Sequence, residues 1–309
     1  MKNQMKILSI LVIWFLLPFV PANTSAAELE RALRQLQQVQ SWAMQLQTID
    51  VEQIATSPLD MVVIDYSKDG SDRQRFTADD IKRMQRKPDG SRRLVLSYLS
   101  IGEAETYRYY WQSHWKSAPP VWLGTENPNW PGNYLVRFWD KDWQEQIAGN
   151  NDSYLSRIEQ AGFDGIYLDR IDVYSDWLKE HPQAEAQMID FVGYISSKAR
   201  RSRPGFIIIG QNAEELLRYD AYRARIDAVS KEDLLYGLKG NESANSPAEI
   251  AWSEKFLRMA QKDNLPVFGI EYLRDKAKIS RAKRYFSEHH YRLTIADRPL
   301  DTLYPLPAE

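Results

Sequence analysis

Short apolar runs that end in acidic or aromatic residues alternate with helical stretches along most of the chain. In the clearest example, residues 162–172, two glycines lead into an apolar run, and carboxylates follow at Asp169 and Asp172. Continuous apolar runs of this kind are typical of parallel strands that are buried on both faces. In a parallel barrel, the carboxyl ends of the strands form the active-site mouth. The pattern therefore predicts a (β/α) barrel whose mouth is lined by acids and aromatic rings.

The spacing of the apolar runs predicts a single (β/α)8 TIM barrel with an extra N-terminal helix and long active-site βα loops. The extra helix is expected at 28–48, where Leu29, Leu33 and Leu36 follow helical spacing. A doubly wound open sheet is the alternative, but no glycine-rich phosphate loop follows the first run. The eight strands are expected at about 60–66, 93–99, 134–139, 164–169, 205–210, 227–230, 267–270 and 291–295.

The N-terminus has the pattern of a secretory signal peptide over residues 1–26. A basic start is followed by an apolar run at 7–20 and then by small residues. The apolar run is short for a membrane span. We expect cleavage after Ala26 or Ala27, a single mature domain at 27–309, and a secreted or periplasmic protein. An uncleaved N-terminal anchor is the alternative.

Composition excludes several classes of chemistry. The chain has no cysteine, so it forms no disulfide and has no thiol nucleophile or cysteine zinc site. The net charge of −2 becomes −4 when the signal peptide removes Lys2 and Lys6 but no acid, which argues against a nucleic-acid partner. No long apolar stretch after residue 26 predicts membrane insertion. The sequence leaves the oligomeric state open.

Neither a metal nor a cofactor is expected from the motifs. The four histidines show no ligand spacing, and the chain has no Gly-x-Ser-x-Gly nucleophile motif. A carboxylate-only metal site formed by Asp65, Asp169 and Asp172 is the alternative that the sequence leaves open.

The acids at two strand ends fit the needs of glycosidic bond cleavage. That reaction uses one carboxyl group as an acid and a second as a nucleophile or base. Asp169 follows the fourth predicted strand and Glu232 the sixth, and we expect these two residues to be catalytic. Capping a helix or holding a loop is the alternative role for a strand-end acid.

Other polar and aromatic residues near strand ends are expected to bind the substrate. Aromatic faces can stack on the C–H surface of a sugar ring, and carboxylates and amides can bind its hydroxyl or amino groups. Tyr107, Trp122 and Trp130 are further aromatic candidates in the loops. The expected substrate-binding residues are Asp65, Tyr66, Tyr98, Glu103, Tyr134, Asp172, Gln211, Asn212, Glu271 and Tyr272.

Two segments carry a resemblance to a known family. Residues 97–105 (SYLSIGEAE) and 162–169 (GFDGIYLD) resemble glycoside hydrolase family 114, the endo-α-1,4-polygalactosaminidases and related secreted proteins. Supporting segments occur in the family's order and cover about residues 58–275. They are residues 62–66 (VVIDY), 132–140 (GNYLVRFWD), 211–212 (QN) and 229–232 (VSKE).

The resemblance implies a (β/α)8 barrel that cleaves α-1,4-linked galactosamine or N-acetylgalactosamine polysaccharide. The family's proposed catalytic pair, an Asp on strand four and a Glu on strand six, corresponds to Asp169 and Glu232. An acidic mouth would attract the amines of a de-N-acetylated polymer. A catalytically inactive polysaccharide-binding barrel and a hydrolase of another α-linked polysaccharide are the alternatives.

Overall fold

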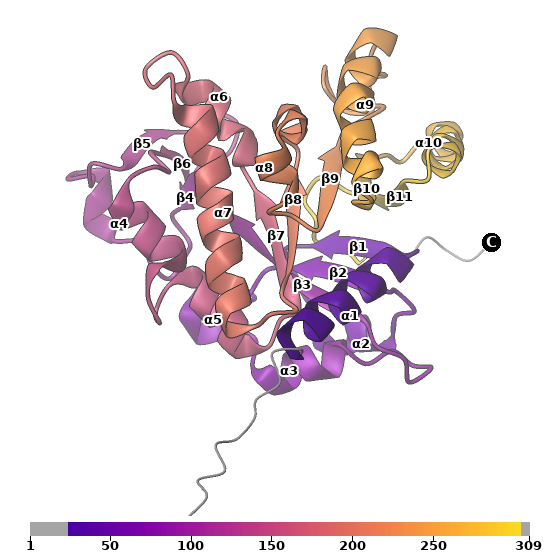
Figure 1. Cartoon of the computed structure of the whole chain (residues 1–309), viewed down its shortest axis with the longest axis horizontal. Coiled ribbons are helices and arrows are strands. Elements are labelled where there is room, and N and C mark those ends of the chain that lie inside the picture. The colour runs from indigo at the N-terminus through magenta and orange to yellow at the C-terminus, as the bar shows by residue number, and fades with distance from the viewer. Residues whose placement is uncertain (1–23, 304–309) are drawn as a thin grey trace, which may run out of the picture.

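The computed structural model describes residues 24–303, and its centre is an eight-stranded parallel sheet that curves into a nearly closed barrel (Figure 1). At the seam, β1 lies beside β11, where Trp42 Nε1 donates to the Arg292 carbonyl at 2.8 Å. The predicted (β/α)8 architecture is confirmed. Around the barrel the strands follow the order β1 (Trp42–Gln45), β2 (Met61–Ile64), β3 (Leu94–Ser100), β7 (Gly165–Asp169), β8 (Ile207–Gln211), β9 (Ala228–Glu232), β10 (Val267–Tyr272) and β11 (Arg292–Ala296).

Each barrel strand is buried on both faces, which explains its continuous apolar sequence. On β2, for example, Met61 and Val63 belong to the inner core of the barrel, whereas Val62 and Ile64 belong to the outer core under the helices. Successive side chains on a strand point to opposite faces. This alternation determines which residue at each carboxyl end faces the mouth.

Helices connect most of the strands and cover the outside of the barrel (Figure 1). Sequence signals mark several of their starts: Thr77 and Asp80 form a capping box on α3, and Ser246 and Glu249 form another on α9. The α-helices are α1 (Thr24–Gln38), α2 (Val51–Thr56), α3 (Ala78–Met84), α4 (Lys141–Gln144), α5 (Tyr154–Ala161), α6 (Tyr174–Trp177), α7 (Ala184–Ser202), α8 (Asp220–Arg223), α9 (Pro247–Lys262) and α10 (Lys276–Glu288).

The N-terminal helix is shorter than predicted, because the first barrel strand lies within the range 28–48. Helix α1 ends at Gln38, and the Asp60 carboxylate accepts hydrogen bonds from the backbone N–H groups of Gln40 and Ser41 at 3.0 Å. The chain then enters β1, where Trp42 and Met44 fill the inner core. A strand of four residues is too short for periodicity to separate it from a helix end.

The strand predicted at 134–139 is not part of the barrel. Instead, β6 (Asn133–Val136) is the middle strand of a small antiparallel sheet with β4 (Glu103–Glu105) and β5 (Leu123–Glu126). This sheet lies beside the barrel near α4 and α6 (Figure 1). It is inserted between β3 and β7 and forms one of the long loops after a barrel strand. The missed strand β1 and this additional strand offset each other, so the total of eight was still correct.

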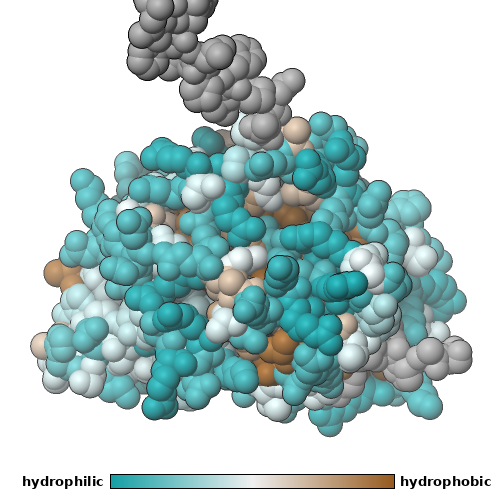
Figure 2. Space-filling model, turned by 90° about the horizontal axis from the view of Figure 1, so that it is seen from below, coloured by the Kyte–Doolittle hydropathy of each residue, from teal (hydrophilic) through white to brown (hydrophobic). Residues whose placement is uncertain are grey.

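The predicted signal peptide lies outside the described residues, except for Thr24, Ser25 and Ala26, which begin α1. Among the helices within residues 24–303, none is both long enough and apolar enough to cross a membrane. The face shown in Figure 2 is mainly hydrophilic, and its apolar side chains form small, separate areas.

Candidate active site

The carboxyl ends of the barrel strands open into a cavity of about 1000 Å³. Residues that continue the inward-facing series of their strands line it: Tyr98 on β3, Asp169 on β7, Gln211 on β8, Glu232 on β9 and Tyr272 on β10. The small sheet and the loops after β2 and β3 complete its wall. The cavity therefore lies where a barrel positions its chemistry.

Asp169 is the last residue of β7 and has hydrogen-bond donors at both carboxylate oxygens. The Tyr98 hydroxyl donates to Oδ2 at 2.6 Å, and the backbone N–H of Arg170 donates to Oδ1 at 2.7 Å. Arg170 has a left-handed backbone, with φ of 59°, at this turn. Burial raises the pKa of Asp169 to about 7; the Tyr98 hydrogen bond opposes this rise, and the negative charge of Glu232 adds to it. Asp169 can therefore change protonation state near neutral pH.

Glu232 is the last residue of β9, and two amide side chains hold it. Gln211 Nε2 donates to Oε2 at 3.0 Å, and Asn212 Nδ2 donates to the same oxygen at 3.3 Å. The Tyr272 hydroxyl also hydrogen-bonds with this side chain. Gln211 Oε1 is buried and has no hydrogen-bond partner among the described residues. The site therefore has two carboxyl groups that interact electrostatically, each held by its own set of donors.

A buried ion-pair cluster supports the wall of the cavity. The Arg108 guanidinium donates to Asp65 Oδ2 at 2.5 Å and also to the Glu105 carboxylate. Burial raises the pKa of Asp65, and the charge of Arg108 opposes that rise. The carboxylate of Asp65 is thus held in a structural pair, although the residue lines the cavity.

Arg170 connects the small sheet to the turn after Asp169. Its guanidinium forms ion pairs with Glu103 at 2.9 Å and with Asp172 at 3.3 Å. Gly102 allows this close approach, because a Cβ atom at this position would lie 2.2 Å from the Arg170 carbonyl oxygen. The small sheet therefore helps to position the backbone next to Asp169.

The structure brings most of the predicted site residues together. The two expected catalytic residues and seven of the ten expected substrate-binding residues line the cavity. They are Asp65, Tyr98, Glu103, Asp169, Asp172, Gln211, Asn212, Glu232 and Tyr272.

Tyr66, Tyr134 and Glu271 do not line the cavity, contrary to the prediction, because strand alternation places them on the other face. Tyr66 follows the inward Asp65, and its ring packs in the outer core. Tyr134 lies between the cavity-lining Asn133 and Leu135, and its ring packs 5.1 Å from that of Trp111.

Glu271 precedes the inward Tyr272 and is fully buried on the outer side of β10. Its Oε1 atom accepts a hydrogen bond from the backbone N–H of Leu235 at 2.6 Å, so it holds the loop that follows Glu232. Burial raises the pKa of Glu271 to about 8. In the structure its side chain supports this loop and does not line the cavity.

Sequence reasoning missed Arg108 and the buried pair of Lys231 and Glu214. Lys231 precedes Glu232 on β9 but lies on the outer face, where its Nζ atom is 3.3 Å from Glu214 Oε1. Alternation from Glu232 would have predicted that orientation. Asp65 and Glu214, which pair with Arg108 and Lys231, come from distant segments, and no local signal identifies them.

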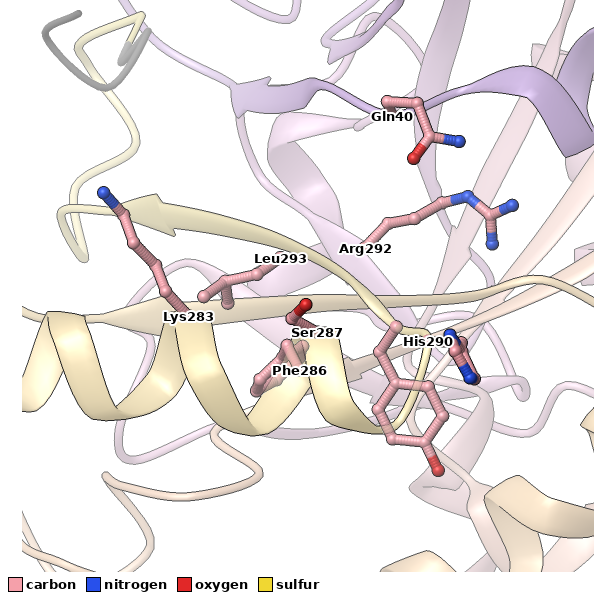
Figure 3. Close-up of a pocket in the computed structure, with 8 residues that line it drawn as sticks. Gln40, Lys283, Phe286, Ser287, His290, Arg292 and Leu293 are labelled. Carbon is pink, nitrogen blue, oxygen red and sulfur yellow. The ribbon is translucent and has the colours of Figure 1, made fainter. Parts of the chain in front are cut away.

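A second cavity, of about 460 Å³, lies at the start of β11 next to α10 (Figure 3). Gln40, Lys283, His290 and Arg292 are among its lining residues, and none of the described lining residues is an acid. It cannot supply a pair of carboxyl groups. Within residues 24–303, no group of three His, Asp or Glu side chains could hold a metal ion, so Asp65, Asp169 and Asp172 do not come together as a metal site.

Comparison with known proteins gives the family. The model of glycoside hydrolase family GH114 matches residues 22–309. The chain belongs to this family. An uncharacterised protein of Methanocaldococcus jannaschii is 37% identical over 244 residues, which cover 77% of this chain and 67% of that protein. Another, from Thermotoga maritima, is 34% identical over 262 residues, which cover 80% of this chain and 76% of that protein.

A solved structure shares the fold. The glycoside hydrolase domain of PelA from Pseudomonas aeruginosa superposes with a TM-score of 0.66, over 86% of this chain and 97% of that domain. The sequences are 16% identical, so this likeness concerns the fold alone. Family membership makes the protein a glycoside hydrolase, and the paired carboxyl groups are the type of residue that this reaction needs.

Proposed function

We propose that the protein cleaves α-1,4-linked galactosamine or N-acetylgalactosamine polysaccharide by a two-carboxylate mechanism, with Asp169 as nucleophile or base and Glu232 as acid. One observation carries this proposal: both residues occupy inward positions at the carboxyl ends of β7 and β9, and they line the same cavity on either side of β8. Asp65 follows β2 and also faces the cavity one strand away from Asp169, but its carboxylate is held by Arg108 in a buried ion pair.

The hydrogen bonds at Asp169 favour a role for its charged form. Donation from Tyr98 and from the Arg170 N–H stabilises the carboxylate more than the neutral acid. Burial keeps its pKa at about 7, and a substrate ammonium group close to the carboxylate would lower that value. Binding of a cationic sugar would thus convert Asp169 to the ionised form that attacks carbon or activates water.

The charge of the cavity supports an amino sugar as the substrate. Among its described lining residues are nine acids and four Lys or Arg residues. Two of these cations, Arg108 and Arg170, are already held in ion pairs with acids of the same wall. A concave surface with excess negative charge concentrates cationic ligands. The amines of a de-N-acetylated galactosamine polymer carry the complementary charge.

Incubation with defined polymers tests the proposal. The mature protein should release new reducing ends from α-1,4-galactosamine polymer, either de-N-acetylated or acetylated. Asp169→Asn and Glu232→Gln should each abolish release without loss of folded structure by circular dichroism. Full activity in either variant would remove that residue from the mechanism. Release only from another α-linked polymer would refute the substrate assignment but retain the hydrolase.

We also propose that the protein acts after export from the cytoplasm. The support is the predicted signal peptide at residues 1–26. N-terminal sequencing of the protein recovered from the periplasm or the medium should begin at Ala27 or Glu28. An intact Met1 in the exported fraction would contradict cleavage.

A further inference from the structure

Two exposed aromatic rings lie at the rim of the cavity, and the proposed two-carboxylate mechanism does not use them. Trp130 is 56% exposed and Tyr107 is 49% exposed, and both line the cavity that contains Asp169 and Glu232. Exposed apolar side chains that gather beside a groove often mark a ligand-binding site, whereas single ones are common on protein surfaces. Both rings lie on the same cavity, which favours a contact with a ligand of that cavity.

The hairpin between β5 and β6 holds Trp130 in a defined position. The backbone N–H of Trp130 donates to the Asn127 carbonyl at 3.2 Å, and its carbonyl accepts from the Asn133 N–H at 3.0 Å. The side chain of Asn127 donates to the buried Glu103 at 2.8 Å. The exposed ring is therefore carried by an ordered turn that is tied to the wall of the active site.

The same hairpin is attached to the segment that carries Tyr107. The Thr106 N–H donates to the Gly132 carbonyl at 2.9 Å. Gly132 has φ of +93°, and a Cβ atom there would lie 2.8 Å from Thr106 Oγ1. This close approach places the two aromatic residues on adjoining segments of one rim.

Contacts of its own side chain hold Tyr107 in place. Its hydroxyl donates to Glu105 Oε1 at 2.7 Å, and the Arg108 guanidinium lies 4.7 Å from the centre of its ring. The exposed part of the ring is thus presented by a side chain that has little freedom left to lose. A pre-positioned ring costs less conformational entropy when a ligand binds.

The chemistry of this rim suits a positively charged sugar ring. The C–H face of a pyranose packs on an aromatic face, and an ammonium group gains cation–π attraction from tryptophan. Glu126 and Asp69 also line this cavity and add negative charge. The rings belong to the loop between β5 and β6 and the loop after β4, whereas Asp169 and Glu232 end barrel strands, so the two pairs reach the cavity from different parts of its wall.

We propose that Trp130 and Tyr107 form an aromatic subsite that binds an amino-sugar ring of the polymer away from the cleaved bond. This subsite rests on the proposed function. It gives the enzyme affinity for a chain rather than for a single sugar. It also predicts that contacts between the substrate and the rim contribute more to affinity as the substrate becomes longer.

Kinetics with α-1,4-galactosamine oligosaccharides of increasing length test the subsite. Trp130→Ala should raise KM for the polymer roughly tenfold with little change in kcat, and Trp130→Phe should recover most of the loss. The effect should diminish as the oligosaccharide becomes shorter. Trp252→Ala is the matched control, because Trp252 is 45% exposed on α9 and does not line the cavity.

The outcomes separate the two proposals. If Trp130→Ala and Trp252→Ala have the same KM for the polymer, the subsite is refuted while the hydrolase assignment stands. If the wild-type protein leaves the galactosamine polymer intact, the proposed function is refuted. In that case, binding of the same polymer to the Asp169→Asn variant, with and without Trp130→Ala, decides the subsite: equal affinity refutes it, and roughly tenfold weaker binding supports it.

Discussion

Replacing Tyr98 by Phe should raise the pKa of Asp169. The substitution removes the hydroxyl that donates to Asp169 Oδ2 at 2.6 Å and keeps the ring that packs in the inner core of the barrel. A hydrogen bond to a charged group contributes about 1.5–3 kcal/mol. Because about 1.4 kcal/mol corresponds to one pKa unit, the pKa should rise by about 1–2 units from its value of about 7.

The pH dependence of kcat/KM on the galactosamine polymer measures this shift. If Asp169 acts as nucleophile or base, activity requires its ionised form, and the acidic limb of the profile should move to higher pH in Tyr98→Phe. Carbon-13 NMR of labelled aspartate carboxyl groups would follow the same titration independently of the catalytic role. The Tyr98 substitution should leave the folded structure intact, because the volume of the ring is retained.

Tyr285→Phe is the control for the loss of a tyrosine hydroxyl next to a carboxylate. Tyr285 hydrogen-bonds to Glu254 Oε1 at 3.2 Å, and neither residue lines the cavity. This variant should leave the acidic limb in place. An unchanged limb in Tyr98→Phe, or a limb at lower pH, would refute the claim that Tyr98 stabilises the Asp169 carboxylate.

Three further predictions concern the packing at Gly102, the buried carboxyl group of Glu271 and the negative charge of the cavity. Gly102→Ala should lower the free energy of unfolding by about 1–3 kcal/mol and reduce activity, because the added Cβ would clash with the Arg170 carbonyl oxygen. Denaturant melts and activity assays measure the two effects, and a variant with the stability and activity of the wild type would refute the prediction. Glu271 has its pKa raised from 4.5 to about 8, so its contribution to stability falls as pH rises through that range. The unfolding free energy of Glu271→Gln should therefore rise relative to wild type by about 3 kcal/mol between pH 5 and pH 8, and a constant difference would contradict it. For a de-N-acetylated polymer, KM should increase when salt is raised from about 0.05 M to about 0.5 M, whereas salt-independent kinetics would remove the electrostatic argument.

Apolar runs and strand-end acids were sufficient to predict the barrel and the positions of Asp169 and Glu232. They failed at β1, because Trp42 and Met44 are buried by contacts with strands far along the chain and not by any local pattern. The same signals failed again at β6, whose short apolar run pairs with β5 in a hairpin and with the more distant β4. Tertiary context decided both segments.

Within the site, sequence reasoning predicted residue types better than residue partners. Arg108 reaches Asp65 across 43 residues of sequence, a pairing that composition and spacing do not encode. Tyr66 and Glu271 were misplaced for a different reason, because each stands next to a residue that does face the cavity. Strict use of the two-residue repeat would have excluded both.

Strand alternation also explains how opposite charges can be neighbours in sequence at this site. Lys231 and Glu232 are consecutive on β9, yet Lys231 forms an ion pair with Glu214 on the outer side, whereas Glu232 faces the cavity. Glu271 and Tyr272 divide between the two faces of β10 in the same way. At each of these two strand ends, one side chain faces the cavity, and its neighbour in sequence packs into the structure that supports the cavity wall. A substitution on the outer face, such as Glu271→Gln, is therefore expected to change stability with pH before it changes the chemistry of the carboxyl pair.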